Sequence, residues 1–247
     1  MSPSTTRSRP NEQAIDTPLN VEKEFPRYVE EVFRSLRTKL LLSLYEESRR
    51  RVAVTSLESG AGKTMVSANL ALSMAQRNIE TLLIDCDLRC GELTTILGPT
   101  AEPGLSDFLD SDIPISAQSA RSLVHQGVQK HLSFIGAGRQ TLNAPELLAS
   151  PRLRSLMSHL APGYELVLFD MPPFGMVVDP VVIQDIIAKY ILVAKAGSTN
   201  IVDLSRKVDE YPKIKKKAMG IVLNQASLDR KLRYYKYSKY YEGGSKR

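Results

Sequence analysis

The sequence predicts an α/β protein with a doubly wound, mostly parallel sheet. Short runs that are apolar at every position alternate with stretches of helical periodicity along most of the chain. Strands that are apolar on both faces are typical of a parallel sheet covered by helices on both sides. The 247 residues, 43% of them hydrophobic and 24% charged, provide a full core for one large domain or two small ones.

The chain divides into four segments. Residues 1–20 are polar and proline-containing, and they predict a disordered arm. Residues 21–50 carry an apolar stripe of helical spacing, made by Val29, Phe33, Leu36 and Leu40. Residues 51–228 contain the alternating strands and helices, and residues 229–247 form a tail rich in lysine and tyrosine.

The elements of residues 51–228 follow one another in a regular order. Apolar runs predict strands at 52–56, 81–87, 132–138, 164–170, 190–196 and 218–224. Helical patterns predict helices at 62–78, 145–160, 179–188 and 201–211, whereas 105–130 mixes helix and loop. Because the helices separate the strands, the expected connections are parallel crossovers.

Composition excludes several classes of protein. No window approaches the ~20 consecutive apolar residues of a membrane span, and no signal peptide is visible, so we expect a cytoplasmic protein. Cys86 and Cys90 make neither a disulfide framework nor a metal site. Most of the net charge of +6 lies in the tail, and the basic run 213–217 is expected to be a solvated face, so no nucleic-acid partner is predicted. A membrane surface or an acidic partner remains the alternative for these basic runs.

A phosphate-binding loop is predicted between the first strand and helix. The run TSLESGAGKT (55–64) places GAGKT after a strand and at the start of a helix. Backbone amides and the helix N-terminus can hold phosphate, Lys63 can reach the β and γ oxygens, and Thr64 can bind Mg²⁺. The loop is a variant, because Leu57 stands where the full pattern has glycine. The expected nucleotide contacts are Ser59, Gly60, Ala61, Gly62, Lys63, Thr64 and Met65.

Three aspartates are placed to complete a nucleotide centre. Asp85 and Asp87 lie at the carboxyl end of one strand and, if that strand stays regular, on the same side of it. Asp170 ends another apolar strand. Ligands of open α/β sheets bind at this edge, so Mg²⁺ is expected near Thr64 and these carboxylates. For Asp87 alone, an N-cap role in a turn is nearly as well supported.

These motifs together resemble the bacterial tyrosine kinases of capsule and exopolysaccharide synthesis (BY-kinases). The phosphate loop SGAGKT resembles their Walker A motif. Asp85-Cys-Asp87-Leu-Arg89 resembles the D-x-D-x-R of Walker A′, and Asp170-Met-Pro-Pro the D-x-P-P of Walker B. Residues 31–37 match E-x-x-R-x-x-R, and residues 143–148 are similar to N-P-x-E-L-L. The resemblance spans about residues 25–242 and includes the terminal tyrosine cluster.

The resemblance implies an ATP- and Mg²⁺-dependent tyrosine autokinase. It implies catalytic roles for Lys63, Asp85 and Asp87, without separating the two aspartates, and nucleotide contacts from Arg89 and Asn224. It further implies transfer between the subunits of a ring, with the helix that bears Glu31, Arg34 and Arg37 as the contact. From the residues alone, a surface helix with an i,i+3 ion pair explains that motif equally well. The implied acceptors are Tyr234, Tyr235, Tyr237, Tyr240 and Tyr241.

The resemblance also implies partners and a location. A separate membrane polysaccharide co-polymerase would activate the chain at the inner face of the membrane, and a phosphotyrosine phosphatase would reverse the labelling. Two alternatives are a nucleotide-dependent ATPase switch and a degenerate kinase that acts as a scaffold. The chain departs from the family at Leu57, Ser59, Cys90-Gly91 and Met171. Glu58 stands where the related partitioning ATPases have a lysine, which separates the chain from that group.

Overall fold

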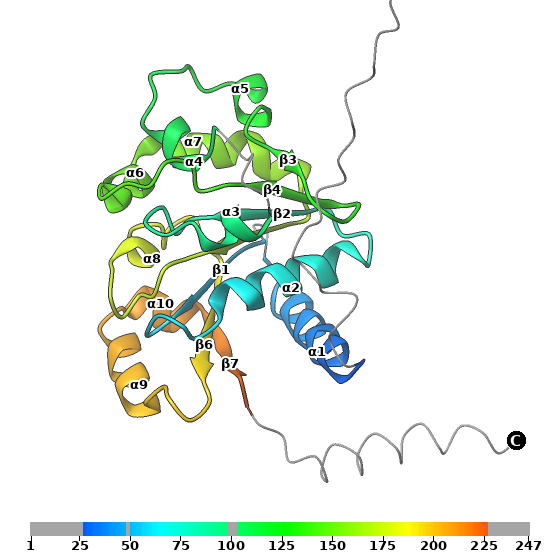
Figure 1. Ribbon diagram of the computed structural model, residues 1–247, viewed down its shortest axis with the longest axis vertical. Helices are drawn as coiled ribbons and strands as arrows, with labels where there is room; N and C mark the ends of the chain where they lie inside the picture. The colour runs from blue at the N-terminus through cyan, green and yellow to red at the C-terminus, as the bar shows by residue number, and fades with distance from the viewer. Residues whose placement is uncertain (1–26, 48–49, 98–102, 227–247) are drawn as a thin grey trace, which may run out of the picture.

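A single seven-stranded sheet organises the part of the chain that the structure describes. The computed structural model describes residues 27–47, 50–97 and 103–226, so the predicted arm and the tyrosine-rich tail lie outside it. The strand order is β3-β4-β2-β5-β1-β6-β7. All neighbouring strands are parallel except the short edge pair β3 and β4. The predicted mostly parallel, doubly wound fold is confirmed (Figure 1).

The strands are short and apolar, as predicted. Their bounds are β1 Arg51–Ser56, β2 Thr81–Asp85, β3 His125–Gln126, β4 Leu132–Ile135, β5 Leu166–Asp170, β6 Lys189–Lys195 and β7 Ala218–Asn224. The central strands β1, β2 and β5 are buried along nearly their whole length. Because they are parallel, their carboxyl ends meet at one edge of the sheet, which is where ligands bind in this class of fold.

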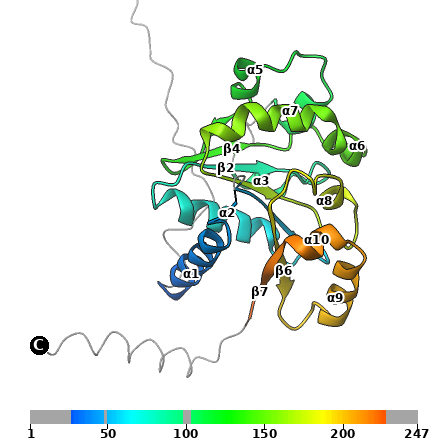
Figure 2. The same cartoon turned by 180° about the vertical axis from the view of Figure 1, so that it is seen from behind.

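Helices cover both faces of the sheet (Figures 1 and 2). Their bounds are α1 Arg27–Ser43, α2 Lys63–Ala75, α3 Glu92–Leu97, α4 Leu105–Leu109, α5 Ala117–Arg121, α6 Ala144–Ala149, α7 Pro151–Leu160, η1 Ala161–Gly163, α8 Asp179–Val182, α9 Ile201–Asp209 and α10 Pro212–Lys217. Helices α1 and α2 pack side by side against one face, whereas α6, α7 and α10 contribute to the core on the other. No described helix is both long and apolar enough to cross a membrane.

The two cores follow from the alternation of side chains along the strands. On β1, Val52 and Val54 join the cluster beneath α1 and α2, and Ala53 joins the cluster on the opposite face. Successive side chains of a strand point to opposite faces, so a strand that is apolar throughout stabilises both layers. The sheet is therefore fixed from both sides, and the loops at its carboxyl edge are held on a rigid support.

Helix α1 is part of the domain core. Leu40 and Leu44 are fully buried, and both belong to the cluster that includes α2. The apolar stripe predicted from the sequence is therefore the face that packs on the domain. The helical segment therefore shares a hydrophobic core with the α/β fold.

Several element boundaries differ from the prediction for local reasons. The helix predicted at 145–160 is two helices, because Ser150 is extended before Pro151, and proline disfavours helical geometry in the residue before it. The strand predicted at 81–87 ends at Asp85. The helix predicted at 179–188 is a single turn, and the basic run 213–217 lies in helix α10, which begins at Pro212.

Candidate active site

The loop between β1 and α2 has the backbone of a phosphate site. Gly60 and Gly62 have φ values of 73° and 86°, in the left-handed region that only glycine adopts freely. Gly62 caps α2, whose regular hydrogen bonds begin with Val66 N–H donating to the Gly62 carbonyl at 3.0 Å. The first amides of the helix are therefore free of intrahelical partners and available to an anion. Ser59 and Gly60 are exposed, whereas Ala61 is buried.

Lys63, Thr64 and Met65 form the first turn of α2. The Lys63 side chain is only 7% exposed, and Thr64 is also buried. The Thr64 hydroxyl donates to Glu92 Oε2 of α3 at 3.2 Å, which places a carboxylate beside the predicted metal-binding hydroxyl. Met65 packs against the core cluster under α1 and α2, so its contribution to the site would come through its backbone.

Asn224, at the end of β7, holds the loop from the side. Its Nδ2 donates to the Ala61 carbonyl at 2.9 Å. A Cβ placed on Gly62 would approach the same Nδ2 to 2.1 Å, so the loop and the amide fit only because residue 62 is glycine. The structure thus brings the predicted Asn224 to the phosphate loop from 162 positions further along the chain.

Asp85 ends β2 in full burial. Its Oδ2 accepts hydrogen bonds from the Thr94 amide at 2.8 Å and the Thr94 hydroxyl at 2.7 Å, and its Oδ1 accepts from the Asp87 amide at 3.1 Å. Burial raises the pKa of Asp85 to about 6, although these hydrogen bonds oppose the shift. Asp85 is a carboxylate that the fold isolates from water and fixes through α3.

Asp170 ends the neighbouring strand β5. It lies opposite Asp85 in the strand register, and its Oδ1 accepts from Ser67 Oγ at 2.8 Å. Burial raises the pKa of Asp170 to about 7, and the nearby charge of Asp85 adds to this shift. Hydrogen bonds from Ser67 and Thr64 and the charge of Lys63 act in the opposite direction. Two buried carboxylates therefore meet beside the lysine of the phosphate loop.

Asp87 does not share the position of Asp85. Because β2 ends at residue 85, strand alternation no longer applies, and Asp87 lies half-buried in the turn before α3. Its Oδ1 accepts from the Cys90 amide at 3.2 Å. Both side chains were expected on the same side only if the strand stayed regular, and that condition is not met because β2 ends at Asp85. The chain places one carboxylate in the interior and one at the surface of the same edge.

Glu58 and Leu57, two positions at which the loop departs from related sequences, contact neighbouring turns. The Glu58 carboxylate accepts from the Thr199 hydroxyl at 2.7 Å, which ties the phosphate loop to the turn after β6. A Cβ on Gly175 would lie 2.1 Å from the Leu57 carbonyl oxygen, so the backbone at Leu57 is packed closely against the turn after β5. Both residues position the loop without occupying its anion-binding side.

The three predicted interface residues of α1 separate into two groups. Arg34 pairs with Glu31 and Glu30 on the exposed side of the helix. Arg37 instead donates from Nη1 to the Ser73 carbonyl at 2.7 Å and to the Ser73 hydroxyl at 2.9 Å, and so connects α1 to α2. Glu31 and Arg34 remain available to a second subunit, whereas Arg37 has partners within the same chain.

Several site residues were not predicted from the sequence. Ser67 contacts Asp170, Thr94 contacts Asp85, and Glu92 contacts Thr64. Ser67 follows Lys63 by one helical turn, a spacing that does signal a shared face. Thr94 and Glu92 had no such signal, because α3 lies in a segment without clear periodicity. Asp179, the first residue of α8, is the fourth site residue that was not predicted, and it faces Arg89.

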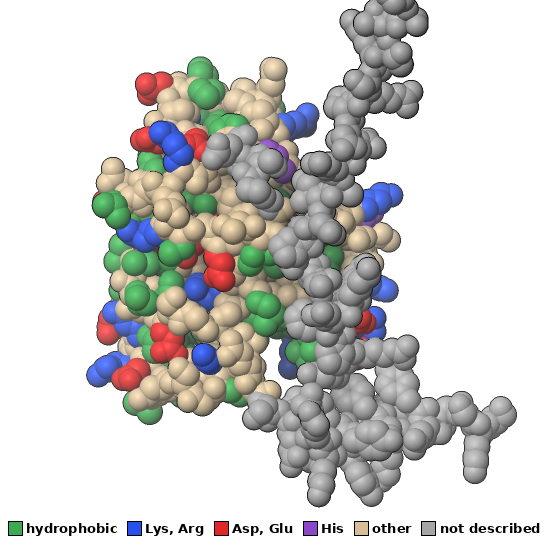
Figure 3. Space-filling model, in the orientation of Figure 1, with side chains coloured by type: hydrophobic (Ala, Val, Ile, Leu, Met, Phe, Trp, Pro, Cys, Tyr) green, Lys and Arg blue, Asp and Glu red, His purple; other side chains and the backbone are tan. Residues whose placement is uncertain are grey.

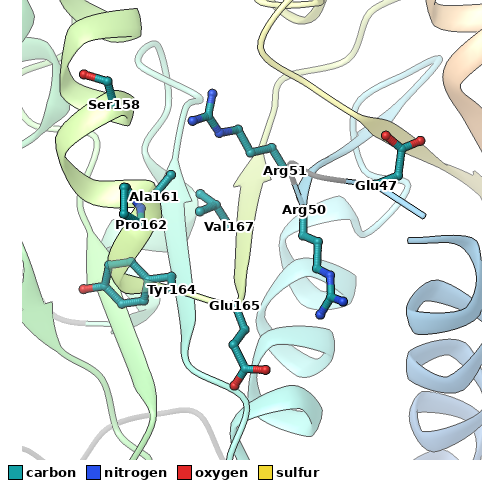
Figure 4. A pocket seen from close by; sticks show the side chains of 9 residues that line it. All are labelled: Glu47, Arg50, Arg51, Ser158, Ala161, Pro162, Tyr164, Glu165 and Val167. Atoms are coloured by element: carbon teal, nitrogen blue, oxygen red, sulfur yellow. The ribbon is translucent and has the colours of Figure 1, made fainter. Parts of the chain in front are cut away.

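A hollow at the opposite edge of the sheet has no comparable arrangement. It has a volume of about 460 Å³ and lies beside the starts of β1 and β5. Figure 4 shows that Arg50 and Arg51 point away from each other there, and the Tyr164 hydroxyl points to a third side. Polar side chains that do not converge do not define a ligand site. The carboxyl edge therefore remains the candidate active site.

Sequence comparison agrees with this geometry. Residues 52–242 match the family model of the CobQ/CobB/MinD/ParA nucleotide binding domain. The match covers the phosphate loop and all three aspartates. The chain therefore belongs to the CobQ/CobB/MinD/ParA nucleotide-binding domain family.

Curated relatives that match most of this chain bear the names of tyrosine-protein kinases. EpsB of Ralstonia nicotianae is 32% identical over 85% of this chain but only 27% of its own length. YwqD of Bacillus subtilis is 28% identical over 84% of this chain and 85% of its own. The kinase domain of the Escherichia coli tyrosine kinase ETK has a TM-score of 0.72 and 27% identity, covering 81% of this chain and 78% of that chain. The predicted resemblance to bacterial tyrosine kinases is confirmed. The chain spans about a quarter of EpsB and most of YwqD.

Proposed function

We propose that this chain is an ATP-dependent protein-tyrosine kinase that phosphorylates its own C-terminal tyrosines between subunits. The observation that carries the proposal is the pair of buried carboxylates, Asp85 and Asp170, beside the buried Lys63 of a phosphate loop. The similar proteins named as tyrosine kinases give the reaction class. The acceptors Tyr234, Tyr235, Tyr237, Tyr240 and Tyr241 lie outside the described residues.

Nucleotide binding follows from the loop and its supports. The amides between Ser59 and Met65, with the N-terminus of α2, would surround the phosphates. Lys63 would neutralise the β and γ oxygens, and the low exposure of its side chain would strengthen that interaction relative to water. Asn224 and Glu58 hold the loop in place from β7 and from the turn after β6.

The donor set fits Mg²⁺. In the described ranges, no group of three or more Asp, Glu, His or Cys side chains is arranged to hold a metal directly. Mg²⁺ keeps several waters and commonly binds one or two carboxylates together with substrate phosphates, so a small set suffices. Thr64, Asp85, Asp87 and Asp170 would hold it, directly or through water, and burial of Asp85 and Asp170 favours a cation there. When bound, Mg²⁺ supplies neutralisation of the charge on the transferring phosphoryl group.

The different burial of Asp85 and Asp87 supports different roles for them in the proposed reaction. The tyrosine oxygen forms a bond to the γ-phosphorus, the bond from that phosphorus to ADP breaks, and the phenolic proton passes to a base. Asp85 is fully buried, and both of its oxygens already accept hydrogen bonds. Asp87 is half-buried at the surface of the same edge. Asp87 is therefore the base in this proposal, and Asp85 orders the site.

The proposed context includes partners. A separate membrane co-polymerase of a capsule or exopolysaccharide system would bind and activate the chain at the inner face of the membrane. A ring of copies, with Glu31 and Arg34 at the contact, would bring the tail of one subunit to the site of the next. A phosphotyrosine phosphatase would remove the label. The exposed Glu31–Arg34 pair supports a contact at this side of α1.

Replacement of Lys63 tests the proposed function. Lys63→Met keeps most of the unbranched side chain but removes its charge, so phosphotyrosine formation should fall to background in purified protein with ATP and Mg²⁺. Lys130→Met, at an exposed position, is the matched control and should label like the wild type. Mass spectrometry assigns the labelled residues to 234–241. Continued labelling of Lys63→Met would refute this use of the loop, and an unlabelled wild type that hydrolyses ATP would instead indicate an ATPase switch.

A further inference from the structure

Helix α8 carries a buried carboxylate, Asp179, that has no role in the phosphate-loop site described above. Asp179 is 0% exposed, and neither carboxylate oxygen has a hydrogen-bond partner among the described residues. The cation facing it is Arg89, whose Nε lies 3.6 Å from Asp179 Oδ1 and is itself buried without a hydrogen bond. The fold holds Asp179 there firmly, because the buried Tyr190 hydroxyl donates to the adjoining Pro180 carbonyl at 2.7 Å.

This arrangement is poor for stability. Asp85 and Asp170 are as deeply buried, but each accepts hydrogen bonds from the surrounding chain. Asp179 has one ion-pair partner, Arg89 at 3.6 Å, and the cost of removing a carboxylate from water can exceed the attraction within a single buried pair. Replacing a buried ion pair of this kind by uncharged side chains of similar volume is often neutral or stabilising. A charge kept where it does not stabilise the fold indicates a role at the site.

Arg89 connects that charge to the phosphate edge. It follows Asp87 by two residues in the Walker A′ motif, and its Nη1 also donates to the Leu142 carbonyl at 3.5 Å. The Arg89 side chain keeps 28% of its surface exposed, at the edge where the proposed base lies. The Arg89 guanidinium, which comes from the turn after β2, thus contacts Leu142 after β4 and Asp179 after β5. The fully buried Asp179 restricts the directions in which the guanidinium can point.

We propose that Asp179 is a positioning residue that orients the Arg89 guanidinium toward the transferring phosphoryl group. This inference rests on the proposed kinase function. Arginine presents a planar set of donors that matches phosphate oxygens, but only when the plane is correctly turned. A carboxylate behind the guanidinium fixes that plane while leaving the outer donors for the phosphoryl group. The benefit appears where charge develops in the transition state more than in the binding of ATP.

The test replaces the carboxylate by its neutral isostere. In Asp179→Asn, we expect kcat for autophosphorylation to fall roughly 10- to 100-fold, as for a misoriented group, with KM for ATP within about 3-fold of wild type. The temperature of unfolding should change little, because the cost of burying the carboxylate is removed together with its ion pair, and the partly exposed Arg89 can still reach water. Arg89→Lys should lower kcat similarly, and the double variant should be no worse than Arg89→Lys alone.

Two further measurements make the result decisive. Asp203→Asn removes an exposed Asp–Arg pair on α9 and should leave both kcat and unfolding unchanged. Calorimetric titration with MgADP and fluoroaluminate, a mimic of the transferring phosphoryl group, should show binding to Asp179→Asn weakened about 10-fold or more, with MgADP alone unaffected. This binding readout holds even if the wild type labels no tyrosine, a result that would count against the proposed function instead. The positioning role would be overturned if Asp179→Asn bound MgADP and fluoroaluminate as tightly as the wild type. It would also be overturned if Asp179→Asn had a lower unfolding temperature but an unchanged kcat.

Discussion

At the scale of single residues, the site contains two carboxyl groups, Asp85 and Asp170, whose charged forms are disfavoured by burial. Burial raises the pKa of Asp85 to about 6 and of Asp170 to about 7, from an ordinary value of 3.8. Between these values and the ordinary one, the folded state holds protons that the unfolded chain has released. The free energy of unfolding therefore falls as the pH rises through this window, and these two groups are most favourable to folding when protonated. A cation bound beside these carboxyl groups would instead favour their charged, deprotonated forms.

The first residue-scale prediction concerns that pH dependence. The nucleotide-free protein should lose stability as the pH rises from about 4 to about 7, and Asp85→Asn with Asp170→Asn should flatten the slope. Binding of MgADP should show the opposite trend and strengthen as the pH rises, because the carboxylates must release protons to receive the cation. Asp112→Asn, at an exposed position, serves as the control and should keep the wild-type slope. Urea unfolding and calorimetry at each pH provide the measurements, and an unaltered slope in the double variant would contradict the assignment.

At the scale of elements, α1 has two different sides. Its apolar side packs on α2 through Leu40 and Leu44, and Arg37 adds charged hydrogen bonds to Ser73. Its exposed side carries Arg34, which pairs with Glu31 of the same motif and with the preceding Glu30. One sequence motif therefore contributes both to the domain core and to a surface that can meet another subunit. The two functions can be separated by mutation.

The element-scale prediction uses the two arginines as a matched pair. Arg37→Ala should lower the free energy of unfolding by about 1.5 to 3 kcal/mol, the usual range for a hydrogen bond to a charged group. Arg34→Ala should change it by less than about 0.5 kcal/mol, because its ion pairs are exposed. Arg34→Ala should nevertheless reduce the fraction of oligomer in sedimentation experiments. Equal losses of stability in both variants would show that the motif is purely structural, and wild-type assembly of Arg34→Ala would remove it from the interface.

At the scale of the whole molecule, charge is unevenly distributed. On the face shown in Figure 3, basic and acidic side chains of the described residues are interspersed. The tail is different, because residues 229–247 carry seven Lys or Arg and two acids, a net charge of +5. Such a tail is attracted to a site that contains Asp85, Asp87 and Asp170.

The whole-molecule prediction is that phosphorylation of the tail loosens the assembly. Each phosphotyrosine adds about −1.5 to −2, so three of them bring the tail from +5 to about zero, and five make it negative. The product would then be repelled by the carboxylates and by bound ATP. Light scattering at one salt concentration should report a larger particle for Lys63→Met than for the autophosphorylated wild type. The same size for both would leave the tail as a substrate that does not control assembly.

The sequence by itself determined the class of fold and the position of the site. Its apolar strands and intervening helices predicted the parallel sheet, because these patterns arise from neighbours within one element. The phosphate loop and the strand-end aspartates were also local, since each motif lies at a junction of two consecutive elements. Knowing that parallel strands share a carboxyl edge was enough to expect Lys63, Asp85 and Asp170 together. The family resemblance then supplied the reaction class.

Only the tertiary structure decided how each of these groups is held. The strand order places β5 between β1 and β2, and so sets Asp170 beside Asp85 across 85 positions of sequence. Thr94 on Asp85, Ser73 on Arg37 and Asp179 facing Arg89 are contacts between separate elements. Such contacts depend on the order in which strands pair and on the side to which each loop turns, and no local pattern encodes either. For that reason the sequence could name the aspartates, but it could not distinguish the fully buried Asp85 from the half-buried Asp87.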